Sequence, residues 1–470
     1  MKRYILTFIL AALCIANAGA QRKPAVPRNL DLSMPDSLPS ATSSLDDEME
    51  ALDEVIEFPG NIRRGDNIVA RGDSGSWLYN IQAKLDKACD AKLFETSQIG
   101  MCIYDLTDNQ LVYAINPTHR MRPASSMKVV TAVTGLNYLG GDYQFTTRLY
   151  TTGSIVDSLH TLRGNVYVVG GMDPKLGATD LSAMAACLKN AGIDSIRGRI
   201  YMDVSMRKDE PMGWGWCWDD GYGPLTALMY DAHDTFAANW LSALKAVGIW
   251  VENVAIAKAT LPLKGVTLRL TRRHSIDDIL KPMLKNSNNT YAESMFYNLA
   301  ALSGKKNATR KEAEAYVNQL ITKFGYKTGN YQIADGSGVS LYDYVTPQLL
   351  VRFLRHAWSN TTIREHFYPA LPIAGVDGTL ASRMKTGKAT ANVHAKTGTV
   401  NGVSSLTGYV KATNGHDLAF SIINMGIVSS SSGRQFQDKI CEILASTKET
   451  PRPVTPEPAV SADATSPTTQ

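Results

Sequence analysis

The sequence predicts an α/β fold in which one domain is closed by strands from both ends of the chain and interrupted by an insertion. Alternating apolar residues predict a first pair of strands at residues 98–105 and 110–116, around the turn signal Asp108-Asn109. A second pair is predicted at 404–411 and 417–428. Between the two pairs, residues 145–264 are rich in strand patterns, which indicates an inserted β-rich domain.

Helical periodicity fills most of the remaining chain. The helix predicted at 126–139 is apolar on most faces, so we expect it to be buried and to end at Gly140-Gly141. The other predicted helices cover residues 77–91, 275–303, 346–358 and 434–445, and strands are predicted within the insertion near 165–169 and 199–204.

Composition excludes several classes of function. The 470 residues include 44% hydrophobic and 20% charged residues, enough to bury a large core. The net charge is +4, which gives no support to nucleic-acid binding. Six cysteines without a C-x-x-C pair, and eight histidines without metal spacing, argue against a metal site. We expect no metal and no organic cofactor.

The two ends of the chain have the composition of unfolded segments. Residues 1–20 resemble a signal peptide, with Lys2 and Arg3 before an apolar stretch, so we expect an exported protein with no integral membrane span. Residues 21–75 are predicted to be a disordered acidic linker, and 447–470 a disordered tail. After export, Cys89 and Cys102 could pair, or the remaining cysteines could stay thiols.

One apparent nucleophile motif is excluded by chain order. Gly72-Asp73-Ser74-Gly75-Ser76 looks like the serine loop of chymotrypsin-like proteases, but that fold needs a histidine before the serine. The first histidine of this chain is His119. A serine activated by a lysine one helical turn away remains the better hypothesis, because residues i and i+3 share a helix face.

Three short motifs are informative only in the order Ser-x-x-Lys, Ser-x-Asn, Lys-Thr-Gly. Ser-x-Asn occurs once, at Ser287-Asn288-Asn289. Ser-x-x-Lys begins at Ser125, Ser205, Ser242, Ser303 and Ser382, and Lys-Thr-Gly begins at Lys327, Lys385 and Lys396. The required order removes the Ser-x-x-Lys motifs that begin after Ser287.

Local context selects one candidate of each motif. Ser125 begins the buried helix, where Lys128 would lose its hydration, and desolvation lowers a lysine pKa toward that of a base. Ser205 lies in a loop pattern, and the lysine paired with Ser242 is most simply a solvated helix position. Lys396 leads into a strong strand, whereas we expect Lys327 and Lys385 to lie in turns.

With these motifs the sequence resembles exported low-molecular-mass penicillin-binding proteins, the D-alanyl-D-alanine carboxypeptidase and endopeptidase family with an insertion after the nucleophile. The resemblance covers about residues 77–446 and is carried by these segments: Pro123-Ala-Ser-Ser-Met-Lys128, Ser287-Asn-Asn289, Asp335-Gly-Ser-Gly338, Leu371-Pro-Ile-Ala-Gly-Val-Asp-Gly-Thr-Leu380 and Ala395-Lys-Thr-Gly-Thr399. Gly170-Gly-Met-Asp-Pro174, inside the insertion, is similar as well.

The family fold implies an antiparallel sheet flanked by helices, like that of β-lactamases. The catalytic domain would comprise residues 76–144 and 265–446, and the insertion residues 145–264. Only 162 residues separate Ser125 from Ser287, which is short for relatives with two inserted domains, so one reduced inserted domain is expected. Leu341 stands where the family commonly has arginine after Asp335-Gly-Ser-Gly.

The resemblance also implies a catalytic set. Ser125 would attack the penultimate D-Ala carbonyl of a peptidoglycan stem peptide, with neutral Lys128 as the base. Ser287 would pass a proton to the leaving group. Asn289 would bind the substrate amide and position Lys128.

A substrate-binding strand is implied by the third motif. Lys396, with the hydroxyls of Thr397 and Thr399, would bind the terminal carboxylate, and Gly398 lies within the same motif. The N–H groups of Ser125 and Thr399 would hold the oxyanion. β-Lactams are the expected inhibitors, and the bacterial periplasm or cell envelope the expected location. A serine β-lactamase and a non-catalytic cell-wall-binding protein of the same fold are the alternatives.

Overall fold

The computed structural model describes residues 71–220 and 223–450. The expected signal peptide, most of the linker and most of the tail therefore lie outside the described residues. Within them, no helix is both long and apolar enough to cross a bilayer. The five described cysteines are thiols, so the possible pair between Cys89 and Cys102 is not formed.

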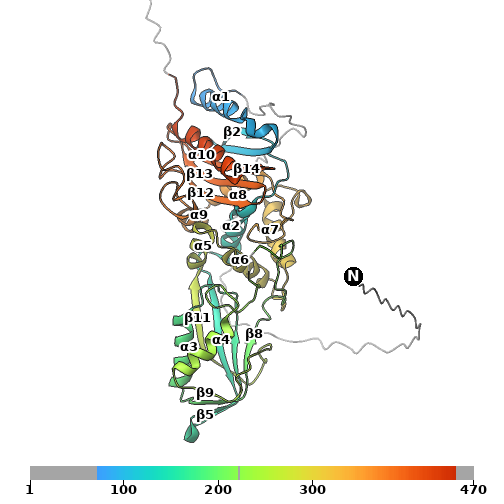
Figure 1. The fold of residues 1–470 in the computed structure, drawn as a ribbon, viewed down its shortest axis with the longest axis vertical. Coiled ribbons are helices and arrows are strands. Elements are labelled where there is room, and N and C mark those ends of the chain that lie inside the picture. The colour runs from blue at the N-terminus through green and yellow to red at the C-terminus, as the bar shows by residue number, and fades with distance from the viewer. Residues whose placement is uncertain (1–70, 221–222, 451–470) are drawn as a thin grey trace, which may run out of the picture. The chain divides into compact units, whose positions relative to one another are not determined.

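The first domain is built on a five-stranded antiparallel sheet with the order β12-β13-β14-β1-β2. Its strands are β1 (Gln98–Asp105), β2 (Gln110–Ile115), β12 (His394–Val400), β13 (Val403–Lys411) and β14 (Asp417–Met425). β1 pairs with β14 along its whole length, so strands from the two ends of the chain lie side by side (Figure 1). This confirms the predicted closure of the domain by both chain ends.

Helices cover both faces of this sheet, which explains why β1 is buried on both sides. Met101 and Ile103 face the core that contains α1 (Trp77–Cys89) and α10 (Ser430–Ser446). Cys102 and Tyr104 alternate with them and face the core of α2 (Met127–Leu139) and α8 (Pro347–Ser359). Gly140 ends α2 with φ +83°, as the sequence predicts.

The insertion has two sheets, with orders β10-β8-β6-β3-β11 and β4-β5-β7-β9. Their strands are β3 (Gln144–Thr152), β4 (Ser154–Val156), β5 (Thr161–Arg163), β6 (Val166–Val169), β7 (Ser195–Arg197), β8 (Ile200–Asp203), β9 (Trp250–Val251), β10 (Ala257–Lys258) and β11 (Val266–Ser275). Two helices share its core. The sequence did not predict α3 (Ala178–Asn190), and of α4 (Phe236–Ala246) it predicted only that Ser242 and its paired lysine lie on a helix. β11 pairs with β3, so this sheet extends past the boundary predicted after residue 264.

The single helix predicted at 275–303 is wrong. Two helices replace it, α5 (Ile276–Lys285) and α6 (Asn289–Ala301). Two further helices, α7 (Arg310–Lys323) and α9 (Thr361–Ala370), were not predicted. The interruption between α5 and α6 falls on the Ser-x-Asn motif.

The ends of the described chain pack against each other. The Thr450 N–H donates to Gly75 O at 2.9 Å, and the Asn80 side chain donates to Lys448 O at 3.0 Å. Residues 447–450, which the composition assigned to the tail, are therefore attached to the start of α1.

Candidate active site

Ser125 lies in a single 3₁₀ turn, Ala124–Ser126, that leads directly into α2. Strand β13 packs against this turn through Ser405. The Ser405 Oγ donates to Pro123 O at 2.6 Å and lies 2.8 Å from the Ser126 Oγ. Ala124 has φ +47°, an uncommon value for a residue with a side chain. The turn leaves Ser125 partly exposed between buried neighbours, so a substrate can reach its hydroxyl.

Lys128 is fully buried one helical turn beyond Ser125. Its Nζ lies 2.9 Å from Ser125 Oγ, 2.6 Å from Asn289 Oδ1 and 2.8 Å from Ser337 O. Burial lowers the pKa of Lys128 to about 7, although nearby carboxylates act in the opposite direction. At neutral pH a large fraction of this amine is therefore unprotonated.

The break between α5 and α6 brings the second motif to this lysine. The N–H groups of Asn286 and Asn288 both donate to Pro282 O, which ends α5. Ser287 then takes φ +58°, and the Asn288 side chain accepts from Tyr291 N to begin α6. Asn289, the first residue of α6, consequently faces Lys128.

The third motif lies on β12, one of the two edge strands of the sheet. The buried Lys396 Nζ donates to Ser287 Oγ at 2.8 Å and to Thr397 O at 2.6 Å. Burial, and next the nearby Lys128, lower the pKa of Lys396 well below its ordinary value. Thr397 Oγ1 also donates to Thr379 Oγ1 at 2.8 Å, so the 371–380 segment contributes to the site.

Gly398 allows β12 to approach the nucleophile closely. A Cβ at this position would lie 2.2 Å from Ser405 Oγ, 2.8 Å from Pro123 O and 3.0 Å from Ser125 N. No side chain fits there without moving the strand or the turn. The glycine thus fixes the distance between the substrate-binding strand and Ser125.

Sequence reasoning assigned no role to a buried carboxylate group behind Lys128. Asp335 organises its own loop by accepting from the N–H groups of Ser337, Gly338 and Ser340 at 2.6–3.0 Å. That loop presents Ser337 O to Lys128. The Asp335-Gly-Ser-Gly segment was noticed as a family feature, so this signal was present in the sequence.

Two other members of this group are Glu293 and Asp343. Glu293 accepts from Gly336 N at 3.0 Å, and burial, followed by the charge of Asp335, raises the pKa of Glu293 to about 8. Asp343 accepts from Ala334 N at 2.7 Å, and burial and Asp335 raise the pKa of Asp343 as well. Both carboxyls favour the neutral form, which limits the negative charge facing Lys128.

The competing motifs lie elsewhere. Lys327 precedes a 3₁₀ turn, and Lys385 is exposed outside helices and strands. Ser205 lies in a loop, and Ser242 is exposed on α4. The structure therefore brings together the predicted set Ser125, Lys128, Ser287, Asn289 and Lys396 to Thr399, and none of these alternatives.

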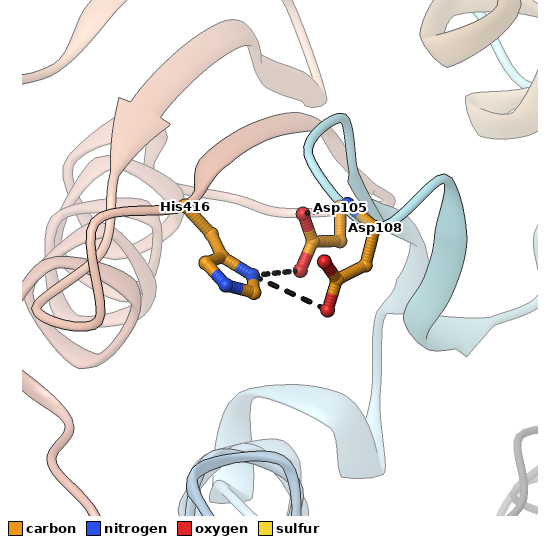
Figure 2. Close-up of side chains that lie close together, drawn as sticks. All are labelled: Asp105, Asp108 and His416. Carbon is orange, nitrogen blue, oxygen red and sulfur yellow. Dashed lines mark hydrogen bonds and ion pairs between the residues drawn. The ribbon is translucent and has the colours of Figure 1, made fainter.

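Two groups of potential metal ligands lie outside this site, and the first is shown in Figure 2. His416 Nδ1 donates to the buried Asp105 Oδ2 at 2.6 Å and lies 3.7 Å from Asp108 Oδ2. Asp105 Oδ1 accepts from the N–H groups of Thr107 and Asp108. These bonds join the β1–β2 turn to the start of β14, so the group has a structural role.

The second group, Cys217, Asp219 and Asp220, lies in the loop before residue 221. Asp220 already accepts from Cys217 N at 2.6 Å. Within the described residues, this group forms no hydrogen bond or ion pair with the residues of the Ser125 site.

The chain is similar to known cell-wall enzymes over most of its length. The D-alanyl-D-alanine carboxypeptidase DacB of Haemophilus influenzae is 27% identical over 416 residues, covering 70% of this chain and 85% of that protein. The crystal structure of penicillin binding protein 4 (dacB) from the same organism matches with a TM-score of 0.67 and 25% identity, over 74% of this chain and 95% of that chain. Its complex with a β-lactam matches with a TM-score of 0.64 and 25% identity, over 75% and 97%.

A family model matches nearly all of the described residues. The model is that of the D-Ala-D-Ala carboxypeptidase 3 (S13) family, and it matches residues 81–233 and 224–447. This match includes all three motifs and the insertion. The chain belongs to the D-Ala-D-Ala carboxypeptidase 3 (S13) family and is a serine peptidase.

Proposed function

We propose that this serine-type D-Ala-D-Ala carboxypeptidase and D,D-endopeptidase acts on peptidoglycan stem peptides through an acyl-enzyme on Ser125. The observation that carries the proposal is the set of contacts of the buried Lys128 Nζ. A neutral amine has two N–H donors and one lone pair. Asn289 Oδ1 and Ser337 O accept the two N–H groups, which leaves the lone pair for the Ser125 hydroxyl 2.9 Å away.

In the first step, Ser125 Oγ attacks the carbonyl carbon of the penultimate D-Ala while its proton moves to Lys128 Nζ. The resulting oxyanion accepts from the N–H groups of Ser125 and Thr399, and each such donor contributes about 3 kcal/mol in comparable sites. When the C–N bond breaks, the leaving amine takes a proton. Ser287, whose hydroxyl accepts from Lys396, would deliver this proton from the pair formed by Lys128 and Lys396.

In the second step, water hydrolyses the ester. Its proton moves to Lys128, its oxygen bonds to the acyl carbon, and Ser125 Oγ leaves with a proton. A carboxypeptidase releases D-Ala in the first step, and an endopeptidase releases the neighbouring stem peptide. Both reactions use the same acyl-enzyme.

The substrate carboxylate would bind at β12. Lys396 Nζ and the hydroxyls of Thr397 and Thr399 are the donors of the Lys-Thr-Gly-Thr segment, and Gly398 brings this strand against the nucleophile turn. Asn289 would accept or donate a hydrogen bond with the peptide amide. A carboxylate-bearing β-lactam presents similar groups, so we propose β-lactams as inhibitors.

The same chemistry implies a location. Peptidoglycan lies outside the cytoplasmic membrane, and the first twenty residues resemble a signal peptide. We therefore place the enzyme in the bacterial cell envelope.

Labelling with a fluorescent penicillin tests the proposal. We expect a stable adduct that mass mapping locates on Ser125, no adduct on Ser125→Ala, and unchanged labelling of Ser242→Ala. Ser242 is the matched control because it begins an exposed Ser-x-x-Lys motif on α4. A folded protein that is never labelled would contradict the acyl-enzyme, and rapid steady-state turnover of penicillin would favour a β-lactamase.

A further inference from the structure

A groove lies where the five-stranded sheet of the insertion meets the C-terminal end of α6, away from the Ser125 site. It encloses a cavity of about 590 Å³. Its lining includes Tyr143, Arg148, Tyr150, Asn298, Lys305 and Lys306. None of these residues takes part in the proposed acyl transfer.

In the part of the insertion that the structure describes, α3 and α4 pack against the other face of the sheet, which leaves this face open. Leu149 packs into the core with α3 and α4. Arg148 and Tyr150 flank Leu149 on β3, so their side chains point to the opposite face. Tyr143 OH donates to Asn298 Oδ1 at 2.7 Å, which fixes the Tyr143 ring at the wall of the groove.

The groove presents more positive than negative charge. Arg148, Lys305 and Lys306 are all exposed. Within residues 71–220 and 223–450, Arg148 and Lys306 form no ion pair, whereas Lys305 pairs with Glu312 at 2.9 Å. Two cations are therefore available to a ligand.

The one carboxylate in the described lining, Asp203, is already engaged. Its Oδ1 accepts from Ser205 N at 2.9 Å, and its Oδ2 accepts from Leu261 N at 2.7 Å. These bonds hold the groove wall formed by the segment after β10. Asp203 is consequently a structural group that forms no ion pair in the described residues, and its single charge leaves the lining, with Arg148, Lys305 and Lys306, positive.

Helix α6 connects the groove to the catalytic site. Its first residue, Asn289, contacts Lys128, and Asn298 lines the groove. Nine residues are two and a half turns, so Asn298 lies about 14 Å along the helix from Asn289 and on its opposite side. A ligand that occupies both sites must therefore be an extended polymer that passes around α6.

We propose that this groove is a second peptidoglycan-binding site, in which Arg148 and Lys306 bind carboxylates of a stem peptide neighbouring the one being cleaved. The charge of the ligand complements the two unpaired cations, and the tyrosine rings provide apolar contact. This inference rests on the proposed function in one respect, which is that the polymer bound in the groove is peptidoglycan. It predicts that the enzyme distinguishes polymeric from short soluble substrates.

Sedimentation of the full chain with insoluble peptidoglycan tests the site. In a Ser125→Ala background, which prevents turnover, we expect Arg148→Gln/Lys306→Gln to bind peptidoglycan about tenfold more weakly. The matched control is Arg163→Gln/Arg197→Gln, which removes two exposed arginines that face each other on β5 and β7. The control should bind as the parent protein does.

Activity separates this inference from the proposed function. With Ser125 present, Arg148→Gln/Lys306→Gln should cleave a short peptide ending in D-Ala-D-Ala at the parent rate but lose about tenfold in kcat/KM on polymeric peptidoglycan. Loss on both substrates, or equal loss in the control, would overturn the groove assignment. So would undiminished binding to glycan strands from which the peptides had been removed. Failure of penicillin labelling would instead contradict the proposed function.

Discussion

Asn289→Asp is the substitution that most directly tests Lys128 as the base. Asn289 Oδ1 lies 2.6 Å from Lys128 Nζ, so the aspartate would place a carboxylate in direct contact with the amine at almost unchanged volume. A carboxylate stabilises the protonated lysine. The base would then be occupied by a proton at neutral pH.

The size of the effect follows from the pKa of Lys128. With a pKa of about 7, roughly half of the lysine is neutral at pH 7. An adjacent opposite charge shifts a pKa by about 1–3 units, and a shift of 2 units leaves only about 1% neutral. We therefore expect acylation by a fluorescent penicillin to fall about 50-fold at pH 7. The loss should be recovered as the pH rises toward 9, because higher pH again removes the proton.

The assay is the second-order acylation rate from pH 6 to pH 10. The diagnostic result is the midpoint of the curve of acylation rate against pH. Asn289 is also proposed to contact the substrate, and loss of that contact would lower the plateau of the curve without moving its midpoint. Asn288→Asp is the matched control: it adds the same charge one residue earlier, and aspartate caps a helix as well as asparagine does. An unshifted midpoint in Asn289→Asp would refute Lys128 as the titrating base.

Three further predictions concern close approach and pH-dependent stability. Gly398→Ala places a Cβ 2.8 Å from Pro123 O; the strand must move, and penicillin acylation should fall about 100-fold with little change in the circular dichroism spectrum. Lys128→Met should remove up to about 3 kcal/mol of the gain in unfolding free energy between pH 7.5 and 9.5. Over that range the unfolded chain binds a proton that the folded lysine does not. The hydrogen bond to Asp105 raises the pKa of His416. The contribution of His416 to stability is therefore fully present below the ordinary histidine pKa and is lost as the pH rises through the raised value. His416→Gln should accordingly lower the melting temperature more at pH 5.5 than at pH 8.5.

The sequence predicted the candidate site well because its motifs depend on local geometry. Ser125 and Lys128 share one helix face whatever surrounds them, and the apolar helix after Ser125 already implied a buried lysine. Strand alternation likewise predicted the two pairs that close the sheet. The order of the strands in the sheet was not predicted, and the pairing of β1 with β14 and the edge position of β12 come from the structure.

Other features depend on contacts that periodicity does not reveal. The pattern from 275 to 303 continues through Asn286, Ser287 and Asn288, yet these residues favour caps and turns over helix interiors. The N–H groups of Asn286 and Asn288 converge on Pro282 O and end one helix, and the Asn288 side chain caps the next. The carboxyls of Glu293, Asp335 and Asp343 are far apart in sequence or separated by loops, and only tertiary packing places them behind Lys128.

If the substrate carboxylate binds at Lys396 as proposed, the two buried lysines of the site give a physical reason for it to be free. Neither Lys128 nor Lys396 forms an ion pair within the described residues, and burial lowers the pKa of both. A substrate carboxylate beside Lys396 would favour its protonated form, and the resulting cation would in turn keep Lys128 neutral. Binding and activation of the base are then one event. A peptide with an amidated C-terminus lacks the charge that would produce this state, so under this proposal the lysine pair would select substrates by charge before any bond to Ser125 forms.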